Sequence, residues 1–153
     1  MTRAGRQSGL ALVEFALTIG FLVAITFGIT EFGRAIYQYD TLAKAARDAA
    51  RYLSTKAPGD AAAIAEATCL AVYGTPSCTG SPLVAGLTTA MVSVCDAVSC
   101  PATNHAQGSA PVQDLVTLTI GGQNNPFTFA SAMPGVVPNI PFGAISVTMR
   151  QVL

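Results

Sequence analysis

Five side chains of this 153-residue sequence could bind a metal ion or form a redox pair. They are the single histidine, His105, and the cysteines Cys69, Cys78, Cys95 and Cys100. The spacing of Cys95, Cys100 and His105 loosely resembles a zinc site. The sequence has no C-x-x-C pair, however, which redox sites and most zinc sites with several cysteines use. We therefore expect neither a bound metal nor a redox function.

Acidic residues could assist His105 in catalysis, but none stands in a recognisable motif. Outside the N-terminal third, the acids are Asp60, Glu66, Asp96 and Asp114. Each has a structural explanation, as a helix cap, a helix surface residue, a turn residue and a strand start. A nucleophile elbow, a phosphate-binding loop and a dinucleotide-binding glycine pattern are all missing from the sequence. We predict no enzymatic activity and no cofactor.

Composition and charge narrow the possible functions further. Hydrophobic residues make up 51% of the chain and charged residues only 10%, against about a quarter in typical soluble domains. Seven of the eight basic residues precede position 57, and the net charge is zero. The C-terminal two thirds therefore carry no basic patch, which argues against a nucleic-acid partner.

Residues 10–30 form an apolar segment that contains one charged residue, Glu14. As a helix, 21 residues span roughly 30 Å, the thickness of a bilayer core. The segment is longer than the apolar region of a secretory signal peptide and lacks a clear small-residue cleavage site. Arg3 and Arg6 precede it, so the positive-inside rule places the N-terminus in the cytoplasm and residues after about 33 outside.

The position of Glu14 needs a reason, because a carboxylate is costly within a bilayer. The stretch SGLALVEFAL resembles the processing site of type IV prepilins, with Gly9 as the last leader residue and Leu10 as the new N-terminus. Glu14 is then the fifth mature residue. An unprocessed anchor in which Glu14 merely reaches the membrane surface is the alternative.

Two further motifs extend this resemblance to the TadE-like family of the tight-adherence (Tad/Flp) pilus system. They are E-x-G-R, at Glu31, Gly33 and Arg34, and A-A-R-x-x-A-R, which contains Arg47 and Arg51. The C-terminal part has the strands, the proline-containing linker and the final strand that the family usually shows. The resemblance is specific over residues 9–54, looser near the C-terminus and weak across the cysteine-containing middle.

The resemblance implies a minor pilin, or pseudopilin, that acts in pilus assembly or initiation and in surface adherence. Its implied partners are the prepilin peptidase, the major Flp-type pilin, other minor pilins and the inner membrane. Cleavage after Gly9 would expose an ammonium on Leu10, which could pair with Glu14 of a neighbouring subunit and set the register between them. The alternative function is that of an unprocessed, single-span anchor for an extracytoplasmic binding domain.

Small residues recur every four positions within the apolar segment, at Ala16, Gly20, Ala24 and Gly28. This spacing allows the backbones of two membrane helices to approach closely. We interpret the four residues as a helix-packing face. The alternative is that glycine and alanine are simply common in membrane helices.

The helix should continue beyond the membrane to about Thr55, because apolar residues recur at steps of three and four. This apolar stripe comprises Phe32, Ile36, Tyr39, Leu42 or Ala43, Ala46, Ala50 and Leu53. Asp40 and Lys44 can form an ion pair at i, i+4. Arg47 and Arg51 lie on the polar side, where they are either solvated or in contact with a partner.

The remaining chain predicts a small α+β head. Asp60 can cap a helix over residues 61 to about 72, and alternating patterns predict strands at 88–97, 114–122 and from 143 onward. Residues 125–130 either extend or follow the middle strand, and residues 131–141, with three prolines, should form a surface loop. The expected organisation is a leader (1–9), a transmembrane helix (10–33), its extracytoplasmic continuation (34–56) and a pilin-like antiparallel head (57–153).

The predicted topology places all four cysteines in an oxidising compartment. Four cysteines allow three pairings, and we favour the sequence-local one, Cys69 with Cys78 and Cys95 with Cys100. Each bond would close a short loop and add about 2–3 kcal/mol in the chain-entropy model. A small head with few aromatic residues benefits from such cross-links.

Overall fold

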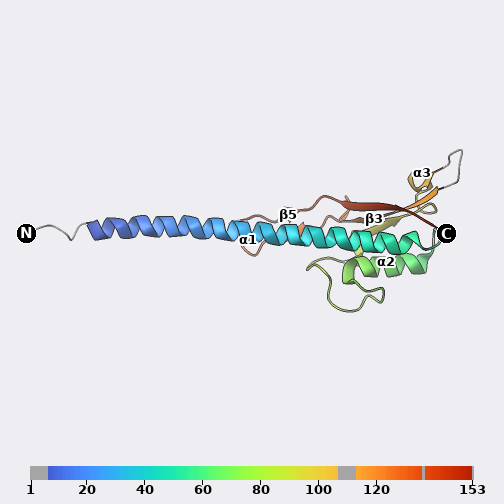
Figure 1. The fold of residues 1–153 in the computed structure, drawn as a ribbon, viewed down its shortest axis with the longest axis horizontal. Helices are drawn as coiled ribbons and strands as arrows, with labels where there is room; N and C mark the ends of the chain where they lie inside the picture. Colours follow the sequence, from blue (N-terminus) through green and yellow to red (C-terminus); the bar gives the residue numbers. More distant parts are fainter. Residues whose placement is uncertain (1–6, 107–112, 136, 153) are drawn as a thin grey trace, which may run out of the picture.

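The structure is a computed structural model that describes residues 7–106, 113–135 and 137–152. It consists of one long helix and a head that packs against the C-terminal part of that helix, while the N-terminal part projects away from the head (Figure 1). The fold is therefore α+β, with a long N-terminal apolar helix followed by a small antiparallel sheet, as expected.

Helix α1 runs without interruption over Gln7–Ser54. Its last turn is followed by turn hydrogen bonds from the amides of Thr55 and Lys56 to the carbonyls of Tyr52 and Leu53, at 3.3 and 3.0 Å. Pro58 and Gly59 come next, and Gly59 has a φ of 76° that suits glycine. The sequence prediction of one helix from the apolar segment to about Thr55 is confirmed.

The predicted apolar stripe of α1 is only partly buried. Leu42, Ala46 and neighbouring positions down to Leu53 form the core, but Phe32, Ile36 and Tyr39 remain 59%, 63% and 48% exposed. The head covers only the C-terminal part of the helix, so the same periodicity continues beyond the edge of the core.

Helix α2, Ala61–Tyr73, packs beside α1 in the same core. The carboxylate of Asp60 caps it by accepting hydrogen bonds from the amides of Ala62 and Ala63, at 3.0 and 3.2 Å. Gly74 ends it in the left-handed conformation, with a φ of 72°. The helix presents the small side chains of Ala63, Ala67 and Ala71 to the core, and their size permits close packing against the alanines of α1.

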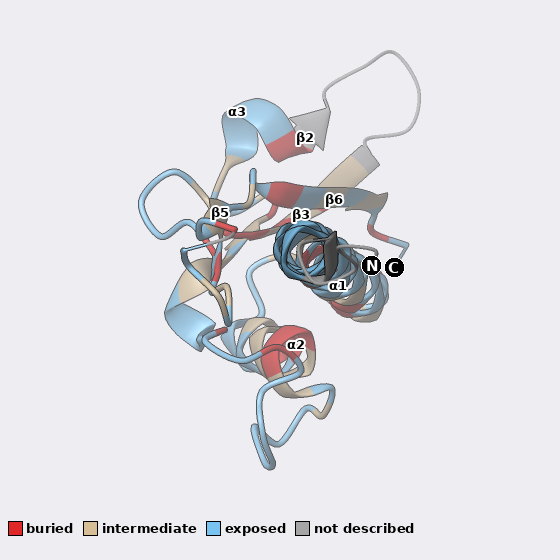
Figure 2. Cartoon of the chain, turned by 90° about the vertical axis from the view of Figure 1, so that its left-hand side faces the viewer, coloured by how far each residue is buried: buried red, intermediate tan, exposed pale blue. Residues whose placement is uncertain are grey.

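The central strand of the sheet is β3, Gln113–Ile120, which pairs antiparallel with β1, Val92–Cys95, and with β6, Ile145–Arg150. Strand β2, His105–Ala106, pairs with the start of β3. Alternate residues Val116, Leu118 and Ile120 are buried against the helices. On the other face, Thr117 and Thr119 bond to the facing hydroxyls of Thr148 and Ser146. The end-on view shows the sheet on one side of α1 and α2 on another (Figure 2).

Three details differ from the sequence prediction. The predicted strand at 88–97 begins instead as a 3₁₀ turn, η1, Thr89–Met91, and only Val92–Cys95 joins the sheet. Helix α3, Pro101–Asn104, and strand β2 were not anticipated. Strand β4, Thr128–Phe129, follows the middle strand without extending it, one of the two predicted alternatives, and pairs with β5, Ile140–Pro141. The segment 131–141 is therefore not a simple surface loop, because part of it is a strand and Val137 is buried.

Candidate functional site

The N-terminal half of α1 is exposed along the length that the sequence assigns to the membrane. Residues 9–27 are all exposed, including Leu10 at 75% and Glu14. The hydroxyls of Thr18 and Thr26 donate to the carbonyls of Glu14 and Leu22, both at 2.8 Å. Such internal hydrogen bonds satisfy polar side chains where water is absent. By length and hydropathy, this helix is a candidate membrane span.

The four small residues of the predicted packing face contact no other part of the described chain that would explain their size. Ala16, Gly20 and Ala24 are exposed, and Gly28 is partly buried. A Cβ atom added at Gly20 or Gly28 would meet no atom within 4 Å, apart from the helix's own nearby backbone. Larger residues would therefore fit within the monomer, and the face is open to a second helix.

The E-x-G-R motif joins α1 to the segment that follows β4. Glu31 is 5% exposed, and its Oε1 lies 2.5 Å from Nη1 of Arg34. Its Oε2 accepts hydrogen bonds from Oγ of Ser131 and the amide of Ala132, at 3.1 and 3.0 Å. The Arg34 guanidinium lies 5.4 Å from the centre of the Phe129 ring, within cation–π range.

These contacts give Glu31 and Arg34 a role in holding the fold together. They do not explain why the third motif residue, Gly33, is a glycine. A Cβ at Gly33 would meet no atom within 4 Å beyond the helix's own backbone, and the residue is exposed. Sequence reasoning grouped the motif correctly but missed its partners. The one available signal was the combination of an acid and an arginine at i, i+3 beside an apolar segment.

The basic residues farther along α1 stay on its surface. Arg47 and Arg51 are exposed, and the structure records no ion pair for either among the described residues. Asp40 and Lys44 form the expected pair, with 2.6 Å between Oδ2 and Nζ. The two alternatives for the arginines, solvation or contact with a partner, both remain compatible with this placement.

The cysteines and the remaining acids serve the fold of the head. Disulfides join Cys69 to Cys78 and Cys95 to Cys100, with Cα–Cα distances of 4.7 and 5.5 Å. This is the sequence-local pairing that the sequence analysis favoured. They use all four sulfur atoms, so the thiols that a zinc site would need are bonded to one another.

Asp96, between the two cysteines of the second disulfide, is 2% exposed. Burial disfavours its charge, but hydrogen bonds from the amides of Ser99, Gly59 and Val98 and from the Ser99 hydroxyl outweigh that effect and lower the pKa of the carboxyl. An acid held ionised by four donors is a structural anchor that ties the start of α2 to the end of β1. The side chain of His105 lies outside the described residues.

An exposed apolar helix that continues into a small disulfide-linked head is consistent with a protein anchored in a membrane by one helix. Residues 9–51 match the model of the TadE-like protein family, the family that the sequence motifs resemble. The match begins at Gly9 and ends within α1, so the similarity covers most of this helix and does not reach the sheet. No curated protein and no solved structure matches the chain.

Proposed function

We propose that this protein is a minor pilin, or pseudopilin, of a Tad/Flp-type pilus. The observation that carries the proposal is the TadE-like match over residues 9–51, which begins at Gly9 and includes Glu14 on a long exposed apolar helix. In this proposal the N-terminus is cytoplasmic, α1 spans the inner membrane and the head is extracytoplasmic. A prepilin peptidase cuts after Gly9, and the protein then joins the major Flp-type pilin and other minor pilins during pilus assembly or initiation, with a role in surface adherence.

The chemistry of assembly depends on the new N-terminus. Cleavage of the Gly9–Leu10 bond removes the basic leader and leaves an ammonium group on Leu10. This ammonium pairs with the carboxylate of Glu14 on a neighbouring subunit, because each group alone is costly in lipid. The exposed face at Ala16, Gly20, Ala24 and Gly28 supports the proposal, since it allows close contact between helices after the leader is removed.

Intact mass of the protein from its native host tests the processing step. We expect a mass that lacks residues 1–9 and four hydrogens, which corresponds to cleavage together with two disulfides. Gly9→Leu should retain the leader, whereas Ala11→Ser, two residues away, should be cut normally. A wild-type protein that keeps its leader beside an active peptidase would favour the unprocessed anchor and overturn the pilin proposal.

The pairing of Glu14 is tested separately from cleavage. Glu14→Ala should be processed, yet it should enter pili far less efficiently than the wild type. Incorporation is measured by immunoblotting of sheared pili, and processing is measured by the mass of the membrane-bound form. Equal incorporation of Glu14→Ala and wild type would refute the ammonium–carboxylate pairing while leaving the processing result intact.

A further inference from the structure

Exposed apolar side chains on α1 continue beyond the apolar segment of residues 10–30. Beyond Thr30 the helix still presents Phe32, Ile36, Tyr37 and Tyr39, which are 59%, 63%, 74% and 48% exposed. In a head surrounded by water such residues would be expected to turn toward the core. Their exposure indicates that a second apolar environment, apart from the protein core, lies at the base of the head.

The length of this exposed surface identifies the environment. Exposed large apolar residues run from Leu10 to Tyr39, which is 30 residues, or roughly 45 Å of helix. A bilayer core accounts for about 30 Å, and a bilayer with both interfacial layers measures about 40–45 Å. The last residues of the run therefore fall in the outer interfacial layer when Leu10 lies in the inner one.

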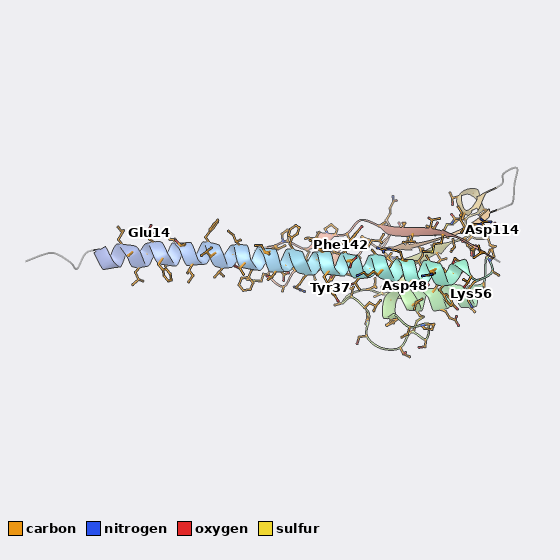
Figure 3. The ribbon with its side chains drawn as sticks, in the orientation of Figure 1. Glu14, Tyr37, Asp48, Lys56, Asp114 and Phe142 are labelled. Atoms are coloured by element: carbon orange, nitrogen blue, oxygen red, sulfur yellow. A yellow bond between two sulfur atoms is a disulfide. The ribbon has the colours of Figure 1, made fainter. Side chains whose placement is uncertain are left out.

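The head adds apolar residues at the same level. The ring of Phe142 packs edge-on against Tyr39, with 5.6 Å between ring centres. Together with Ile140 it borders an apolar groove of about 230 Å³ beside α1. Tyr37 and Phe142 lie at a similar level along the helix but on opposite sides of it (Figure 3). Aromatic side chains gather in this way at membrane interfaces, where an apolar ring can lie beside polar headgroups.

The segment after β4 reaches farther along α1 toward its N-terminal half than the rest of the head (Figure 1). Ser131 and Ala132 contact Glu31, eight residues closer to the N-terminus than Tyr39. No Asp, Glu, Lys, Arg or His occurs between Asp114 and Arg150 in the sequence. Both carboxylate oxygens of Glu31 have partners, so this level carries little uncompensated charge.

We propose that residues 130–135 and 137–142 and the adjoining surface of α1 from Phe32 to Tyr39 lie in the interfacial layer of a phospholipid bilayer, so that the head sits on the membrane instead of standing clear of it. A lipid layer fits better than a docked second helix. A single helix would cover one side of α1, whereas exposed or half-buried aromatic residues occur on both sides. This inference concerns the unassembled, membrane-bound protein and does not depend on a role in pili.

The experiment uses tryptophan as a depth probe, because the chain contains none. Ala132→Trp places the probe at the level of Glu31, and Phe142→Trp places it at the level of Tyr39. Val98→Trp is the matched control, since Val98 is 65% exposed in the turn after β1, away from this segment. Each full-length variant is reconstituted into phosphatidylcholine vesicles that contain lipids brominated either near the headgroup end or near the methyl end of the acyl chains.

We expect brominated lipids to quench Ala132→Trp and Phe142→Trp and to leave Val98→Trp unquenched. Quenching should be stronger with bromine near the headgroup end, and Ala132→Trp should be the deeper of the two. The two probes are independent, so one misfolded variant, detected by circular dichroism, leaves the other as a valid test. If neither well-folded probe is quenched more than Val98→Trp, the head stands clear of the bilayer and the inference is wrong. If a second copy of this protein covered both tryptophans and brominated lipids quenched neither, the inference would also be wrong.

Discussion

The carboxylate of Glu31 accepts a hydrogen bond from the backbone amide of Ala132 at 3.0 Å, across 101 positions of sequence. The same carboxylate pairs with Arg34 one turn farther along the helix. One side chain therefore joins the middle of α1 to the segment between β4 and β5. Glu31 is 5% exposed, and its carboxylate is the shared acceptor of Arg34, Ser131 and Ala132 in three part-buried hydrogen bonds.

Glu31→Ala should destabilise the head by about 1.5–3 kcal/mol, because it removes a charged acceptor of part-buried hydrogen bonds. Urea unfolding in detergent micelles, followed by near-ultraviolet circular dichroism, measures this change. Asp40→Ala is the matched control, because it removes the exposed Asp40–Lys44 pair and should cost only about 0.3–0.5 kcal/mol. Equal effects of the two substitutions would show that the Glu31 contact contributes no more than a surface ion pair.

Asp96→Asn should weaken the head mainly above the pKa of an unfolded aspartate. The folded-state pKa of Asp96 is lowered, so its ionisation stabilises the wild type fully above about pH 4. This contribution is lost as the pH falls through the folded-state pKa. The free energy of unfolding of the variant should therefore approach that of the wild type in acid. A difference that stays constant from neutral to strongly acidic pH would contradict the assignment.

Replacing both cysteines of a pair by serine should destabilise the head by about 2–3 kcal/mol in the chain-entropy model. Loss of Cys69–Cys78, with a sequence separation of 9, should cost slightly more than loss of Cys95–Cys100, with a separation of 5. Thermal unfolding of the two double variants measures the order. After the Cys95–Cys100 bond is removed, the hydrogen bond from the Cys100 amide to the Asp96 carbonyl, 2.8 Å long, would still hold this loop closed. A larger loss from this pair would reverse the predicted order.

Gly20→Leu should leave the monomer folded but reduce its association with other membrane helices. The structure has open space where the new side chain would lie, so an effect on association would come from contact with another chain. Thr18→Leu places the same leucine side chain about half a turn away on the exposed helix and is the control. Disulfide cross-linking of single-cysteine variants in vesicles, made in a background without the native cysteines, would measure association. If Gly20→Leu associates as well as the wild type, these small residues do not form a helix-packing face.

The sequence by itself determined the elements whose causes are local. The apolar run and the three- and four-residue periodicity predicted α1, and Asp60 and Gly74 marked the ends of α2 by capping. Alternation over residues 114–122 predicted the strand that the structure shows as β3. In each case neighbouring residues carry the physical cause, because helix and strand periods and caps act over a few positions.

The tertiary structure decided where the head ends and what lies beside it. Periodicity cannot distinguish Leu42, which is buried, from Ile36, which is exposed, since both occupy the same stripe. Likewise, the pairing of β4 with β5 and the contact between Glu31 and Ala132 join segments that are distant in sequence. Such contacts form only when the chain closes long loops, and the packing energy that favours one closure over another depends on the whole head.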